Sequence, residues 1–125
     1  MKLAIVGSRT MGEEFYELLE KNVPNGVTTI LSGGAKGADS LARRVAQERK
    51  IPLEEILPNY KIFGKMAPIV RNREIVQKAD LVLCLWDGIS PGTRNVISLC
   101  MDCLLYTSYS RYFSMACRAS FSEKP

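Results

Sequence analysis

Residues 3–9 read Leu-Ala-Ile-Val-Gly-Ser-Arg, a continuous apolar run that ends in a Gly-Ser-Arg turn. An apolar run without polar alternation predicts a strand that is buried on both faces. Further strand patterns occupy residues 27–31, residues 51–57, where Glu54 and Glu55 interrupt the run, and residues 81–86, which are the clearest in the chain. We therefore expect a strand at each of the four places.

Helical patterns separate these strands. The segment before Pro24 carries an apolar stripe at helical spacing, and residues 38–49 and 69–79 do the same. A fourth helix is expected to begin at Pro91, with Ser90 as its cap. Strands that alternate with helices indicate a parallel sheet covered on both faces. The sequence thus predicts an α/β fold, a Rossmann-like three-layer sandwich with a mostly parallel sheet in which the first and fourth strands are neighbours.

The last part of the chain has a different character. Residues 1–99 carry the strand-helix alternation, whereas residues 100–125 are rich in Ser, Tyr, Arg and Cys and lack a clear strand period. A weak strand pattern covers Leu104 to Thr107 only. We expect one domain over residues 1–99 and an atypical tail over residues 100–125, so that the final strand of the sheet is missing or irregular.

Composition removes several classes of function. The chain has no histidine, which excludes histidine-based triads and histidine-ligated metal sites. Cys100 and Cys103 form a single CxxC without a second pair, which is weak evidence for zinc, and no metal site is expected. No apolar run approaches the roughly 20 residues that span a bilayer. We expect a cytoplasmic protein without membrane contact, and a homo-oligomer is left open.

Three polar loops follow three of the predicted strands, and they are the strongest functional signal. Parallel strands all end at the same edge of a sheet, where open α/β sheets bind their ligands. Together with an Arg-Asn pair in the third helix, these loops supply the candidate ligand-binding residues: Gly7, Ser8, Arg9, Ser32, Gly33, Gly34, Gly37, Asp39, Arg71, Asn72, Asp87, Gly88, Ser90, Gly92 and Thr93.

The chemistry of these loops fits a phosphate group. Glycines let backbone N–H groups approach an anion, and the helix after each loop adds a partial positive charge. Arg9 and Arg71 can add full positive charge, and the net charge of +4 suits an anionic ligand. Two readings stay open for Asp39, a helix cap or an acceptor for a ribose hydroxyl. Asp87 is open in the same way between a turn and a ligand contact.

The glycine patterns match neither of two common nucleotide motifs. Residues 33–40 read GGAKGADS, which lacks the Gly-Lys-Ser/Thr ending of a Walker A loop. The GxGxxG fingerprint of dinucleotide-binding domains is also absent. The sequence therefore supports neither a P-loop ATPase nor a standard dehydrogenase, and it identifies no cofactor.

Four segments in this order resemble the SLOG superfamily, and its YspA/YpsA-related branch most closely. They are GSR after the first strand, SGGAKGADSLA after the second, GKMAPIVRNREIV, and ADLVLCLWDG followed by a Gly-Thr pair. The resemblance runs from Met1 to about Ser98. It implies a Rossmann-like fold with a site for nucleotides or nucleotide-derived ligands. The motif positions are Gly7, Ser8, Arg9, Gly33, Gly34, Gly37, Asp39, Arg71, Asn72, Gly92 and Thr93.

The relatives in this superfamily differ in activity, so the resemblance leaves function open. LOG-type phosphoribohydrolases carry PGGxGTxxE, in which the glutamate assists glycosidic cleavage. Here Gly92 and Thr93 match the Gly-Thr pair, but Val96 stands at the glutamate position. We therefore assign no catalytic residue and expect a binding protein, a sensor or carrier of a nucleotide-derived phosphate ligand. The alternatives are a nucleoside-phosphate hydrolase and, as in DNA-processing protein A, a single-stranded DNA-binding protein.

Overall fold

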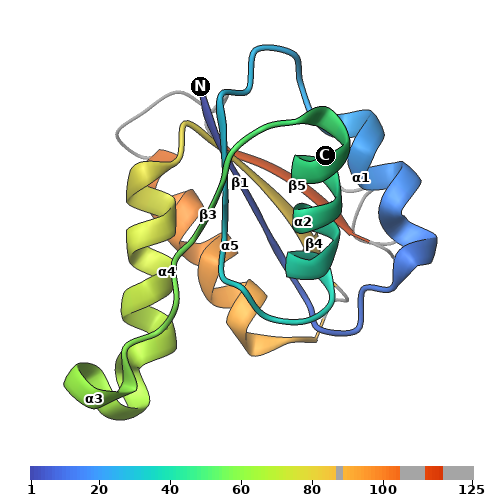
Figure 1. Cartoon of the computed structure of the whole chain (residues 1–125). Helices are drawn as coiled ribbons and strands as arrows, with labels where there is room; N and C mark the ends of the chain where they lie inside the picture. Colours follow the sequence, from blue (N-terminus) through green and yellow to red (C-terminus); the bar gives the residue numbers. More distant parts are fainter. Residues whose placement is uncertain (87–88, 105–111, 117–125) are drawn as a thin grey trace.

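The computed structural model describes residues 1–86, 89–104 and 112–116. Its strands are β1 (Lys2–Gly7), β2 (Thr29–Ser32), β3 (Leu53–Glu55), β4 (Leu81–Trp86) and β5 (Tyr112–Ala116). Its helices are η1 (Glu13–Phe15), α1 (Tyr16–Asn22), α2 (Ala38–Arg49), α3 (Tyr60–Phe63), η2 (Gly64–Met66), α4 (Ala67–Lys78) and α5 (Pro91–Leu104). Figure 1 shows the strands running side by side between the helices.

The sheet is five-stranded in the order β3-β2-β1-β4-β5, and every ladder is parallel. β1 and β4 are neighbours, with Leu3 opposite Leu81 and Gly7 opposite Leu85. The predicted α/β class, the parallel sheet and the pairing of the first and fourth strands are thus confirmed. Because all strands point the same way, the loops that follow them gather at one edge.

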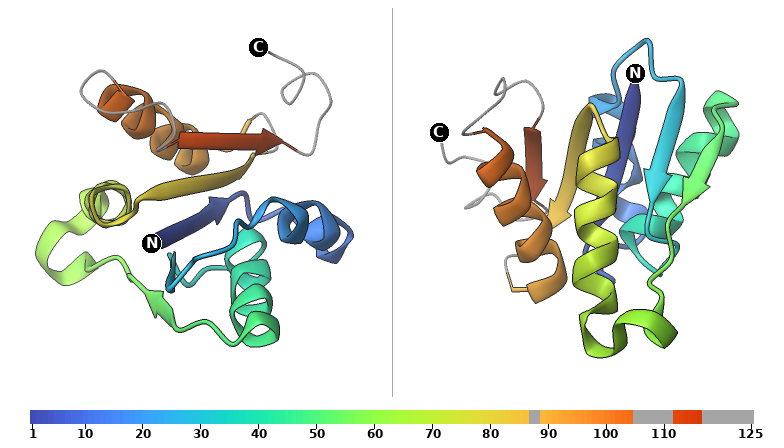
Figure 2. Two further views of the ribbon diagram at one scale, coloured as in Figure 1. Left: turned by 90° about the horizontal axis from the view of Figure 1, so that it is seen from above. Right: turned by 90° about the vertical axis from the view of Figure 1, so that its left-hand side faces the viewer.

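Two separate apolar clusters cover the two faces of the sheet. On β1, Leu3 and Ile5 pack with α1 and α2, whereas Ala4 and Val6 pack with α4 and α5. Successive side chains of a strand point to opposite faces, so one buried strand supplies both clusters. Figure 2 shows the resulting three layers, with the sheet between the two helix layers.

The tail contributes regular structure that the sequence pattern did not indicate. α5 continues to Leu104, across the expected boundary at residue 99, and β5 pairs with β4 from Val82 to Trp86. The predicted strand over Leu104 to Thr107 is wrong at Leu104, which is helical; residues 105–107 lie outside the described part of the chain. The division into residues 1–99 and a tail stays a prediction.

The connection after β3 also holds more structure than expected. Residues 58–68, which carry no clear pattern, fold into α3 and η2, and α4 begins at Ala67 with Pro68 in its first turn. Asn59 caps α3 by accepting a hydrogen bond from the Ile62 N–H. Figure 1 shows α3 projecting from the body at its lower left. Among the described residues, no helix is long and apolar enough to cross a membrane.

Candidate functional site: a polar cleft at the carboxyl edge of the sheet

A cleft of about 350 Å³ opens at the edge where β1, β2 and β4 end. This volume lies in the range of small-molecule sites, about 300–1,000 Å³. Ten of the predicted residues line it: Gly7, Ser8, Arg9, Gly33, Asp39, Arg71, Asn72, Ser90, Gly92 and Thr93. The structure therefore brings together residues from all three loops and from α4.

The other five predicted residues are not among the described lining of the cleft. Ser32 and Gly37 do not line the cleft, and Gly34 lines a second hollow beside it. Asp87 and Gly88 lie outside the described residues. Among the lining residues that sequence reasoning missed are Thr10, Ala35, Pro68 and Val96. Only Ala35 and Thr10 could have been found, because both stand within or directly after the polar loops.

Close backbone contacts hold the loop after β1 in place. The Ser8 carbonyl oxygen accepts hydrogen bonds from the N–H groups of Met11 and Ala38, each at 3.2 Å. The Ser8 N–H donates to the Leu85 carbonyl at 2.9 Å. A Cβ on Gly7 would overlap Leu85 and come within 2.7 Å of the Ala38 Cβ. The backbone of Ser8 thus connects the end of β1 to the start of α2 and to β4.

The segment of residues 33–37, which we call the β2 loop, is fixed by side chains. Asp39, only 6% exposed, accepts a hydrogen bond from the Ala35 N–H at 2.9 Å. Arg71 donates through Nη1 to the Gly33 carbonyl at 2.9 Å and to the Ile56 carbonyl at 3.3 Å. Asp39 does not cap α2, because the N-cap residue is Gly37 and no side chain makes a cap hydrogen bond there; its carboxylate holds the β2 loop instead. Its role as an acceptor for a ribose hydroxyl stays a prediction.

Burial and the neighbouring charge have opposite effects on the pKa values of Asp39 and Arg71. Burial raises the pKa of Asp39, and the Ala35 N–H and the nearby Arg71 partly offset that rise. Burial lowers the pKa of Arg71, and Asp39 opposes it. A guanidinium remains protonated in proteins. The cleft floor therefore carries a fixed cation beside its carboxyl group.

Asn72 connects the floor to the opposite wall. Its side chain is buried, and its Oδ1 accepts from Arg71 Nε at 2.9 Å. Its Nδ2 donates to Asn95 Oδ1 at 3.0 Å and approaches the Gly92 carbonyl at 3.5 Å. Both predicted residues of α4, Arg71 and Asn72, therefore form hydrogen bonds within the protein that hold the cleft together. Arg71 uses its Nε and Nη1 atoms in this way.

The segment of residues 89–93, which we call the α5 turn, forms the opposite wall. Trp86 at the end of β4 donates from Nε1 to the Ser90 carbonyl at 3.0 Å and so anchors the turn. Thr93 is 5% exposed and lines the cleft, yet its hydroxyl has no hydrogen-bond partner among the described residues. A Cβ on Gly92 would meet no atom of the described residues within 4 Å. The Thr93 hydroxyl of this wall is therefore not used by any described residue.

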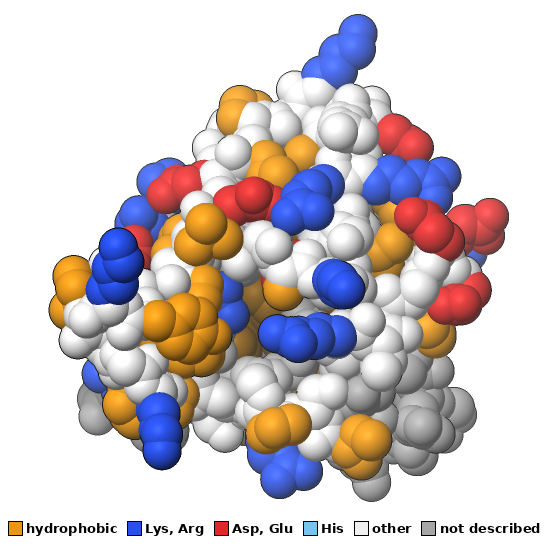
Figure 3. Space-filling view, turned by 60° about the horizontal axis from the view of Figure 1, so that its bottom comes forward, with side chains coloured by type: hydrophobic (Ala, Val, Ile, Leu, Met, Phe, Trp, Pro, Cys, Tyr) orange, Lys and Arg blue, Asp and Glu red, His pale blue; other side chains and the backbone are white. Residues whose placement is uncertain are grey.

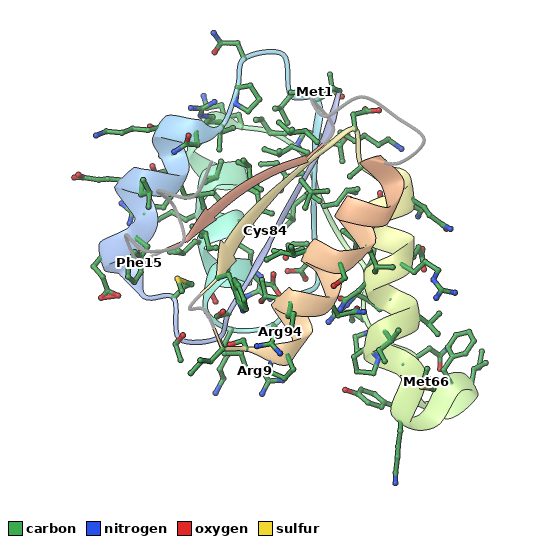
Figure 4. The ribbon with its side chains drawn as sticks, turned by 180° about the vertical axis from the view of Figure 1, so that it is seen from behind. Met1, Arg9, Phe15, Met66, Cys84 and Arg94 are labelled. Carbon is green, nitrogen blue, oxygen red and sulfur yellow. The ribbon has the colours of Figure 1, made fainter. Side chains whose placement is uncertain are left out.

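The cationic side chains lie at the mouth of the cleft. Arg9 is exposed, lines the cleft and forms no ion pair with a described residue. Arg94, on α5, lies over the Trp86 ring, and Figure 4 shows both Arg9 and Arg94 at the end of the molecule where α5 begins. Figure 3 shows Lys and Arg side chains gathered around the hollow on this face. An anion entering the cleft meets positive charge first.

Carboxylate side chains are few in the described lining of the cleft. Asp39 is the one carboxylate among the described residues that line the cleft. Across the described ranges, no group of three or more Cys, Asp or Glu side chains is placed to hold a metal ion.

A parallel sheet with helices on both faces and a polar cleft at its carboxyl edge defines a Rossmann-like α/β protein. Within that class, residues 1–63 match the YspA, cpYpsA-related SLOG family, abbreviated YAcAr. The match covers half of the chain, and the protein belongs to this family. Membership suggests nucleotide-related binding or processing. No curated protein and no solved structure shows significant similarity to the chain.

Proposed function

We propose that this protein binds the phosphate group of a nucleotide or nucleotide-derived ligand in the cleft, as a sensor or carrier. The observation that carries the proposal is the buried Thr93 hydroxyl, which lines the cleft without a hydrogen-bond partner among the described residues. A buried polar group without a partner costs free energy, so such a group at a cleft indicates a ligand.

The surroundings of Thr93 favour an anion as that ligand. Thr93 lies in the first turn of α5, where helix N–H groups are free to bind and the helix dipole is positive. Gly92 leaves space for a close approach, and Arg9 at the mouth has no carboxylate partner in the described chain. We assign phosphate contact to the α5 turn and charge to Arg9.

The same cleft argues for binding rather than hydrolysis. Val96, at the position of the phosphoribohydrolase glutamate, is buried and lines the cleft. Asp39 is the remaining carboxylate of the described lining, and its Oδ2 accepts from the Ala35 N–H. A general base must reach the proton it removes, and Asp39 is held by the loop instead. We therefore propose no catalytic residue.

Calorimetric titration with AMP, GMP and the matching nucleosides tests this function. We expect the monophosphates to bind at least tenfold more tightly than the nucleosides, with affinity that falls as salt rises. Thr93→Val should weaken monophosphate binding about three- to tenfold, because it removes one hydrogen bond and little volume. Thr29→Val, at the start of β2, is the matched control and should change nothing.

Equal binding of nucleosides and monophosphates, or an unchanged affinity in Thr93→Val, contradicts the proposal. A single-stranded DNA oligomer belongs in the same titrations, because α3 gives that alternative a specific basis. Tyr60 and Phe63 are 61% and 43% exposed there, beside the exposed Lys61. Bases stack on exposed aromatic rings while lysines contact the backbone. Tight binding of oligo-dT with no binding of monophosphates favours the DNA-binding function.

A further inference from the structure

A second hollow of about 290 Å³ adjoins the cleft. It is lined by Arg9, Gly34, Ala35, Lys36, Ser40 and Arg43. Arg9 and Ala35 line both spaces, so a ligand in the cleft can extend into the second one without leaving the protein surface. Nothing in the chemistry assigned to the cleft uses this hollow.

The second hollow is cationic. Three of its six lining residues are Lys or Arg, and none is Asp or Glu. Arg43 is neutralised by Glu55, at 2.7 Å from Nε to Oε2. Arg9 and Lys36 form no ion pair with any described residue. Two uncompensated positive charges therefore face one space, an arrangement that a bound anion stabilises.

The backbone brings these charges together. Gly37 has a φ of 71°, and a Cβ there would come within 2.6 Å of the Arg9 Cα. Only glycine allows the β2 loop to lie this close to the end of the loop after β1. Arg43 also donates from Nη2 to the Gly34 carbonyl at 3.1 Å. The hollow is therefore held open by the same loop that forms the cleft.

We propose that Arg9, Lys36 and Ser40 form a second anion subsite beside the loop that Arg43 holds, and that the ligand carries a diphosphate group. This inference rests on the proposed function: one phosphate binds at the α5 turn, and the adjoining phosphate binds beside Lys36. Arg9 lines both spaces and contacts both phosphates. Neighbouring phosphates in one ligand match two neighbouring anion sites that share a residue. The ligand class is a nucleoside diphosphate or a dinucleotide joined through a pyrophosphate.

Titration of matched mono- and diphosphates tests the subsite. AMP with ADP, and GMP with GDP, are measured by calorimetry in EDTA, so that divalent cations do not bridge the phosphates. In the wild-type protein we expect the diphosphate to bind about tenfold or more tightly than the monophosphate. Lys36→Ala should remove most of this advantage. Lys21→Ala makes the same change on α1, remote from the cleft, and should preserve it.

The outcomes separate this inference from the proposed function. If monophosphates bind but diphosphates bind no more tightly, the second subsite is wrong and the proposed function stands. The same conclusion follows if Lys36→Ala and Lys21→Ala keep the same diphosphate advantage. If neither the monophosphates nor the diphosphates of adenosine and guanosine bind, the proposed function and the second subsite are both wrong. Lys36 and Lys21 are exposed, so both variants are expected to fold.

Discussion

The two walls of the cleft differ in how their polar groups are used. Three contacts fix the β2 loop from within the protein: Arg71 to Gly33, Arg43 to Gly34, and Ala35 to Asp39. In the α5 turn, by contrast, the described residues leave space at Gly92 and offer no hydrogen-bond partner to the buried Thr93 hydroxyl. The protein's own side chains hold the β2 loop, whereas the Thr93 hydroxyl of the α5 turn has no hydrogen bond to a described residue.

This difference revises the expected role of Arg71. From its sequence position we expected Arg71 to clamp a phosphate, but two of its nitrogens bind carbonyl and amide oxygens of the protein. A side chain that is already committed in this way positions the site first. We therefore propose that the ligand contacts Arg9 and Thr93, whose side chains have no such partner in the described part of the chain. Substitutions in the two walls should therefore affect different quantities.

The largest effect is expected for Arg71→Ala. It leaves the Gly33 and Ile56 carbonyls and Asn72 Oδ1 without their charged donor, so the free energy of unfolding should fall by about 3 kcal/mol. Arg73→Ala removes an exposed arginine from the same helix and should change the free energy of unfolding by less than about 0.5 kcal/mol. Urea denaturation measures both. Equal, small effects would mean that Arg71 does not hold the β2 loop.

A pair of glycine substitutions compares the two walls directly. A Cβ on Gly33 would lie 2.6 Å from Arg71 Nη1 and 3.1 Å from Asp39 Oδ2, so Gly33→Ala should cost about 1–3 kcal/mol of stability. Gly92→Ala meets open space within a helix and should leave stability unchanged or raise it by up to about 1 kcal/mol. Thermal unfolding checks both, and a destabilised Gly92→Ala would show that the α5 turn is as tightly packed as the β2 loop.

The smallest effect is a pH dependence that belongs to Asp39. Because burial raises its pKa in the folded state, the native protein keeps the Asp39 proton to higher pH than the unfolded chain does. The contribution of Asp39 to stability therefore falls as pH rises from the ordinary aspartate pKa through the folded-state pKa, and is constant above it. The stability difference between wild type and Asp39→Asn, measured across that interval, should show this fall. A difference that increases with pH would mean that Arg71 outweighs burial.

The sequence was sufficient for the parts of the fold that depend on continuous apolar runs. β1 and β4 are buried on both faces, so their residues read as strands without any tertiary information. β5 could not be predicted, because Tyr112–Ala116 carries no strand period of its own and its pairing with β4 is a tertiary contact. α3 likewise lies in a segment without an apolar stripe.

The sequence was sufficient to predict which positions lie at the candidate site. It was not sufficient to predict which of their side chains bond to the protein itself. Parallel topology alone places Gly7, Gly33 and Gly92 at one edge. Whether an arginine binds the protein or a ligand depends on side-chain geometry, which sequence spacing does not contain. Val96 and Pro68 line the cleft from helices, where their types indicate ordinary packing. The second hollow could not be predicted, because it depends on the close approach of the β2 loop to Arg9, which is a tertiary contact.

Amide chemical shifts during a titration test the central claim most directly, namely that the α5 turn receives the phosphate. In ¹⁵N–¹H spectra, AMP or GMP should shift the Gly92 and Thr93 signals strongly, and the Ala35 signal much less, because its N–H already binds Asp39. The matching nucleosides at the same concentration should leave Gly92 and Thr93 in place. Equal shifts with nucleosides and monophosphates, or monophosphate shifts confined to α3, would contradict the account.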